Sequence, residues 1–135
     1  MSVTANSGGR ADVELRLPAD SAYASVLRTT TAGLAARLDF TIDDIEDLRI
    51  AVGEANAMVL EHAAPGSDLV ACFFLTPGEM TVTVTVATAS PAEPDLDSFA
   101  WQVLTTLATS ADYTAADDHF SVSMTMASSA VGAGL

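Results

Sequence analysis

The stretch Asp47-Leu-Arg-Ile-Ala-Val-Gly-Glu-Ala-Asn-Ala-Met-Val-Leu-Glu-His-Ala63 decides the fold that we predict for this chain. With the residues that precede it, the stretch has the apolar spacing of an amphipathic helix over about 41–63. Thr41 is the expected N-cap, and Asp44 follows it at the spacing of a capping box. Apolar residues then recur at steps of three and four along one face: Ile45, Leu48, Val52, Ala55 and Val59.

Glu54 lies on a second face of this helix. At roughly 100° per residue it is about 130° from the centre of the apolar face, where a solvated glutamate is expected. Ile50 and Met58, one turn away on either side, share the face of Glu54. A carboxylate between two apolar side chains indicates that this second face is also covered.

The run from Asp47 to Glu54, ending at His62, resembles the N-box helix of the anti-sigma-factor serine kinases, a branch of the GHKL ATPases. In that family the helix carries Glu-x-x-x-Asn-x-x-x-His, where the Glu is the general base and the Asn holds Mg²⁺. The resemblance implies a catalytic base at Glu54, or the relic of one. Met58 replaces the Mg²⁺-binding Asn, and a thioether is a poor ligand for an ion that requires hard oxygen donors.

The resemblance extends over most of the chain. A helix is predicted over about 21–38, and its Arg28 falls where the family carries an arginine that contacts the partner protein. The resemblance therefore implies partner binding by Arg28, and an ordinary exposed arginine is the alternative. A third helix is predicted over about 97–109. Alternating or apolar runs predict strands over 11–17, 69–75, 80–86 and 120–126, with one more short strand over 110–116.

The glycine motifs that hold the nucleotide in the family are missing here. The family's Asp-x-Gly-x-Gly box, whose Asp reads adenine, is replaced by Ala87-Thr88-Ala89-Ser90-Pro91. Its glycine-rich turn is replaced by Ser98-Phe99-Ala100-Trp101. We predict that Phe99 and Trp101 fill the vacated cavity, packing near Met58; the alternative is that one ring is a surface anchor for a partner. We expect no cofactor, with ATP and Mg²⁺ bound only if the chain is an active kinase.

Charge and composition limit the partners. The 135 residues carry a formal net charge of −13, and all five basic residues are arginines at or before Arg49. This balance argues against binding nucleic acid or anionic membranes, and the part of the chain after Arg49 has no Lys or Arg to offset the charge of a triphosphate. We find no signal peptide, no membrane-spanning run and no cluster of metal ligands, and we expect a cytoplasmic protein without a metal. The lone Cys72 excludes an internal disulfide and is predicted to be a small core residue.

The length predicts a single domain over residues 11–127, with a disordered N-terminus (1–10) and a flexible tail (128–135). The resemblance implies an α/β two-layer sandwich of the GHKL (histidine-kinase-like ATPase) fold, with three helices on one face of a mixed sheet. It identifies the chain as a degenerate, actinobacterial-type member whose kinase activity is lost. Its function would be to sequester an alternative sigma factor until an anti-anti-sigma protein releases it, and a homodimer is left open. The alternatives are an active serine kinase of an anti-anti-sigma protein, with Glu54 as base, and a generic acidic interaction module.

Overall fold

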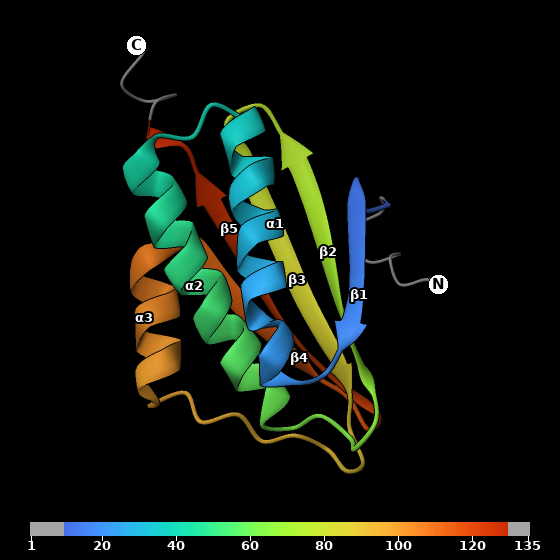
Figure 1. The fold of residues 1–135 in the computed structure, drawn as a ribbon. Coiled ribbons are helices and arrows are strands. Elements are labelled where there is room, and N and C mark those ends of the chain that lie inside the picture. Colours follow the sequence, from blue (N-terminus) through green and yellow to red (C-terminus); the bar gives the residue numbers. More distant parts are fainter. Residues whose placement is uncertain (1–9, 130–135) are drawn as a thin grey trace.

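The computed structural model of the protein describes residues 10–129, which form one five-stranded sheet with three α-helices on one of its faces (Figure 1). In chain order the elements are β1 (Val13–Pro18), the 3₁₀ turn η2 (Ser21–Tyr23), α1 (Ala24–Arg37), α2 (Ile42–Leu60), β2 (Asp68–Thr76), β3 (Glu79–Ala87), α3 (Phe99–Leu107), β4 (Ser110–Ala115) and β5 (His119–Ala127). All the helices and strands that the sequence predicts are present, close to their predicted bounds. The predicted two layers are confirmed.

The sheet has the strand order β1-β2-β3-β5-β4, and each of its pairings is antiparallel. The prediction of a mixed sheet is therefore corrected. Each helix or strand runs opposite to the one before it (Figure 1), with η2 and α1 taken as one pass. Neighbouring strands are separated by an odd number of such reversals, so every pair comes out antiparallel.

The core lies between the helices and the sheet. On β3 and β5 every second residue is buried, as the alternation in the sequence predicts, and the buried set is Met80, Val82, Val84, Val86, Phe120, Val122, Met124 and Met126. The predicted apolar face of α2 packs against these strands, and its residues Leu48, Val52, Ala55 and Val59 are at most 1% exposed. Burying side chains of this size contributes roughly 1.5–3 kcal/mol each, so α2 is fixed firmly in the middle of the helical layer.

The predicted disordered N-terminus and flexible tail fall largely on residues 1–9 and 130–135, which lie outside the described residues. Ser128 and Ser129 belong to the predicted tail and are described. The backbone N–H of Ser128 donates to the carbonyl oxygen of Gly78 at 2.7 Å, which continues the contact of β5 with β3 beyond the end of the strand.

Candidate functional site

The N-terminus of α2 is fixed by hydrogen bonds to one carboxylate. The predicted capping box is present: the hydroxyl of Thr41 accepts from the backbone N–H of Asp44 at 3.1 Å, and Oδ2 of Asp44 accepts from the N–H of Thr41 at 3.3 Å. Ser129 donates its backbone N–H (2.9 Å) and its hydroxyl (2.8 Å) to the same oxygen. Burial raises the pKa of Asp44, but the hydrogen bonds from Ser129 and Thr41 outweigh it and hold the pKa below its ordinary value of 3.8.

Glu54 lies on α2 between Ile50 and Met58, as predicted, and its side chain is half-buried. Within residues 10–129 no hydrogen bond or ion pair holds its carboxylate. Met58 is only 6% exposed, whereas Ile50 is 49% exposed, so the second face of α2 is covered on the Met58 side alone. The position that the resemblance assigns to the Mg²⁺ ligand is thus a buried thioether next to an unpaired carboxylate.

Arg28 on α1 packs against α2 at Gly53, the residue that precedes Glu54. A Cβ atom added to Gly53 would lie 3.5 Å from Cδ of Arg28 and 3.9 Å from one of its terminal guanidinium nitrogens. Both distances are those of ordinary van der Waals contact, so the arginine stem packs on the backbone of α2 at Gly53, and Arg28 is half-buried. Among the described residues the guanidinium makes no ion pair. The structure thus places Arg28 against α2 one position before Glu54, and no carboxylate of residues 10–129 forms an ion pair with it.

A row of aromatic contacts connects α3 to the sheet and to the end of α2. Trp101 is partly buried, and its ring meets Tyr113 of β4 edge to face with centroids 6.0 Å apart. Tyr113 contacts Phe120 of β5 at 6.3 Å, and Phe120 contacts His62 at 5.0 Å. Pairs of this kind add about 0.5–1.5 kcal/mol to the burial of the rings. His62, which matches the His of the N-box, is therefore part of the packing between α2 and the sheet.

Phe99 does not fill a cavity, and the prediction that both rings turn inward is wrong for this residue. Its side chain is 76% exposed. Phe99 is the first residue of α3 and lies two positions before Trp101, which corresponds to about 200° around the helix. With Trp101 and Leu104 turned to the core, Phe99 falls on the outer side. The alternative from the sequence, a surface ring, describes Phe99.

The segment after β3 has no acidic group where the family carries its adenine-reading aspartate. Thr88 stands in this segment, 9% exposed, and its backbone N–H donates to the carbonyl oxygen of Asp118 at 3.0 Å. Its hydroxyl oxygen is buried and has no hydrogen-bond partner among the described residues. A buried polar group without a partner costs about 1–3 kcal/mol, which makes this a point where a water molecule or another polar atom would be stabilised.

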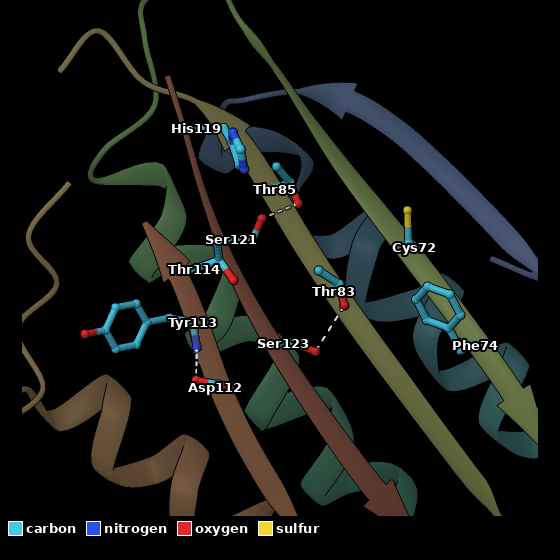
Figure 2. A pocket seen from close by; sticks show the side chains of 10 residues that line it. All are labelled: Cys72, Phe74, Thr83, Thr85, Asp112, Tyr113, Thr114, His119, Ser121 and Ser123. Carbon is cyan, nitrogen blue, oxygen red and sulfur yellow. Dashed lines mark hydrogen bonds between the residues drawn. The ribbon is translucent and has the colours of Figure 1, made fainter. Parts of the chain in front are cut away.

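The face of the sheet opposite the helices carries a ladder of hydroxyl groups. Three pairs cross from β3 to β5: Thr81 with Thr125 (2.8 Å), Thr83 with Ser123 (3.1 Å) and Thr85 with Ser121 (2.7 Å). Figure 2 shows two of these pairs beneath a hollow of about 600 Å³. The same side of the sheet carries Glu14 and Arg16 on β1 and Asp112 on β4. Between them the ladder and its neighbours on β2 form what we call the open face, whose half-buried residues have no formal charge: Val70, Cys72, Phe74, Thr81, Thr83, Thr85, Ser121, Ser123 and Thr125.

The sequence contained the signal for this open face. The period of two that buries the valines of β3 also places Thr81, Thr83 and Thr85 together on the other side. The same alternation therefore predicts both faces of β3.

Cys72 lies on the open face and not in the core, which corrects the prediction for this residue. Its Sγ lies 4.0 Å from Oε2 of Glu14 on the neighbouring strand β1. Burial, and then the negative charge of Glu14, raise the pKa of the Cys72 thiol above its ordinary value of 9.0. The thiol is thus kept protonated and poorly nucleophilic at neutral pH.

Residues 10–129 contain neither a candidate metal site nor a candidate membrane-spanning helix. This part of the chain brings no three His, Cys, Asp or Glu side chains together in a way that could hold a metal ion. None of its helices has both the length and the apolar character required to cross a bilayer.

The fold matches that of a solved protein. The crystal structure of the RsbU and RsbW domains of Rv1364c from Mycobacterium tuberculosis aligns with a TM-score of 0.65 at 16% sequence identity, over 86% of this chain and 31% of that chain. At this identity the likeness concerns the fold alone. The five-stranded sheet with three helices is therefore an RsbW-like architecture.

Sequence similarity also points to proteins named RsbW. The serine-protein kinase RsbW of Halalkalibacterium halodurans is 42% identical over 74 residues, which cover 54% of this chain and 46% of that protein. RsbW of Bacillus velezensis is 45% identical over 51 residues, covering 38% of this chain and 32% of that protein. The matches thus span less than half the length of these relatives, and no family model matches the chain. The resemblance to anti-sigma-factor serine kinases that the N-box helix predicts is confirmed by these identities.

Proposed function

We propose that this protein is an anti-sigma factor of the GHKL fold, which sequesters an alternative sigma factor and is released by an anti-anti-sigma protein. The observation that carries the proposal is the 42–45% identity to serine-protein kinases named RsbW. The RsbW-like fold supports it, since the matched structure aligns over 86% of this chain. The net charge of −13 is also suitable, because sigma factors present basic DNA-reading surfaces and complementary charge accelerates association.

Pull-down tests the partner. The tagged protein is recovered from its native cells, and bound proteins are identified by mass spectrometry. We expect a sigma factor or an anti-anti-sigma protein, and Arg28→Glu should weaken capture of one of them at least tenfold. Arg37→Glu, on the same helix but exposed, is the matched control for the change in charge. Recovery of an unrelated partner by the parent protein would favour the generic interaction module.

We further propose that the nucleotide site is eroded. Three features of the chain support this: Met58 is a buried thioether where the family has an oxygen donor, the segment at Thr88 has no acid, and no Lys or Arg follows Arg49. Calorimetric titration with Mg-ATP should therefore show no saturable heat at millimolar concentrations. A dissociation constant below about 100 μM, equivalent to roughly −5.5 kcal/mol, would contradict the erosion.

The active kinase is the second candidate, and two observations favour it. Glu54 has an unpaired carboxylate on the helix that matches the N-box, and Thr88 has a buried hydroxyl without a partner. Both would be suited to a bound nucleotide. Saturable binding of Mg-ATP that Glu54→Gln leaves intact, with transfer of phosphate to a captured partner only by the parent protein, would establish this reading.

The open face is the proposed interface of a homodimer. Two copies of a chain with a net charge of −13 repel each other, and the nine residues of the open face carry no formal charge, with Glu14 and Arg16 on β1 and Asp112 on β4 bordering them. In an isologous dimer the same surface of both copies is in contact, so the hydroxyl ladder of one copy would face the hydroxyl ladder of the other. Light scattering should give twice the monomer mass for the parent, and Thr83→Lys should give a monomer. The matched control is Thr106→Lys on the exposed side of α3, which should stay dimeric; a monomeric parent would refute the interface.

A further inference from the structure

The segment that leads into α3 exposes apolar side chains among carboxylates. Phe99 is 76% exposed and Leu96 is 43% exposed. Glu93, Asp95 and Asp97 alternate with them and are all exposed. We call these five residues the α3 entry surface.

None of the acids of the α3 entry surface has a basic partner within the described part of the chain, where Arg16 pairs with Asp68 and Nδ1 of His119 contacts Asp118. The chain has no Lys or Arg after Arg49, so the surface also has no nearby cation in sequence. Phosphate groups of nucleic acids or anionic lipids would be repelled. A partner that complements this surface therefore carries positive charge. It also presents an apolar side chain to Leu96 and Phe99.

The α3 entry surface is held in a fixed shape by local hydrogen bonds. The N–H of Asp97 donates to Oδ1 of Asp95 at 2.9 Å, and the N–H of Ser98 donates to the carbonyl oxygen of Asp95 at 3.2 Å. The hydroxyl of Ser98 then caps α3 by accepting from the N–H of Trp101 at 3.2 Å. The ring of Trp101 faces inward and packs on Tyr113, which fixes the rotation of α3 about its axis. Phe99 is therefore held on the outer side of the helix. A preorganised surface loses little conformational entropy on binding.

We propose that the α3 entry surface is a docking site for a basic amphipathic segment of a partner protein. The ring of Phe99 and the side chain of Leu96 receive the apolar residues of that segment, and the three carboxylates pair with its arginines. An arginine guanidinium can also stack on the Phe99 ring while it pairs with a carboxylate. Phe99 lies on α3, and α2 separates α3 from α1, the helix of Arg28 (Figure 1), so loss of the Phe99 contact is distinguishable from loss of the Arg28 contact.

The test uses two fluorescent peptides with the full-length protein. One peptide places arginine and leucine on opposite faces of a helix, and the other has serine in place of each leucine. We expect the parent to bind the leucine peptide at least tenfold more tightly than the serine peptide. Phe99→Ser should remove that preference, a tenfold loss or about 1.4 kcal/mol. The exposed position predicts that the melting temperature of this variant stays close to that of the parent.

Two double variants distinguish binding at the α3 entry surface from long-range attraction of a basic peptide to an acidic protein. Asp95→Asn with Asp97→Asn should weaken binding of both peptides and reduce the dependence of binding on salt. Asp117→Asn with Asp118→Asn removes the same charge from exposed positions before β5 and should have a much smaller effect. Equal effects of the two pairs, or unchanged binding by Phe99→Ser, would overturn the proposal and leave only long-range attraction.

Discussion

Replacement of Asp44 by alanine should destabilise the protein more than its position on the surface of a helix indicates. Three donors lose their acceptor: the N–H of Thr41, and the N–H and hydroxyl of Ser129. At about 1 kcal/mol for each hydrogen bond, reduced for partial exposure, the free energy of unfolding should fall by about 2 kcal/mol. With a urea dependence of roughly 2 kcal/mol per molar, the unfolding midpoint should fall by about 1 M.

The effect of Asp44→Ala should depend on pH in a defined direction. The pKa of Asp44 is lowered in the folded protein, so its contribution is fully present above the ordinary value of 3.8 and is lost as the pH falls through the folded value. Urea unfolding at pH 7 should therefore show the full difference from the parent, and at pH 2.5 the difference should be smaller. Asp43→Ala is the control, since it removes an exposed acid from the same turn. Equal losses for the two variants, or a loss at pH 2.5 as large as at pH 7, would refute the reasoning.

Three further predictions concern packing, turn geometry and the thiol. Trp101→Ala should cost about 2–4 kcal/mol in urea unfolding because the ring is packed against the core, whereas Phe99→Ala should change stability by less than about 0.5 kcal/mol; similar costs would contradict the opposite orientation of the rings. Gly78→Ala should lower stability by about 1–2 kcal/mol, because Gly78 has a φ of 77° in the turn between β2 and β3. Alkylation of Cys72 by iodoacetamide at pH 8 should be slower in the folded than in the unfolded protein, and Glu14→Gln should accelerate it by removing a charge that raises the thiol pKa; an unchanged rate would show that Glu14 does not act on the thiol.

The elements of this fold could be predicted because their signals are local. The start of α2 is encoded by Thr41 and Asp44, three positions apart, and its buried face by residues three or four apart. The alternating positions of β3 and β5 likewise predict which side chains are buried. These patterns depend on the geometry of one helix or strand, and that geometry does not change with the rest of the molecule.

Most of the errors concern relations between distant parts of the chain; Cys72 is the exception, because the alternation on β2 places it opposite the buried side. Ser129 contacts Asp44 across 85 positions, and no periodic pattern relates the two. The all-antiparallel sheet depends on the number of reversals between strands, which the resemblance did not supply. Phe99 and Trp101 are both aromatic, and only the rotation of α3 on the sheet determines which ring is buried. At the site, the sequence located Glu54 and Met58, whereas the packing of Arg28 over Gly53 required the structure.

The position of β1 at the edge of the sheet has a consequence for how the chain folds. The β2–β3 hairpin closes through a two-residue turn, but Pro18 can pair with Asp68 only after the connection through α1 and α2 has been closed. Closing that longer loop costs more entropy, so we expect β1 to join the sheet late in refolding. Until then the edge of β2 presents Val70-Ala-Cys-Phe-Phe-Leu75, a run without charge or proline that can pair with another chain. In the finished sheet Glu14 and Arg16 on β1 supply a charged edge that opposes such pairing. Because β1 joins late, a newly made chain passes through an interval in which it is prone to aggregate.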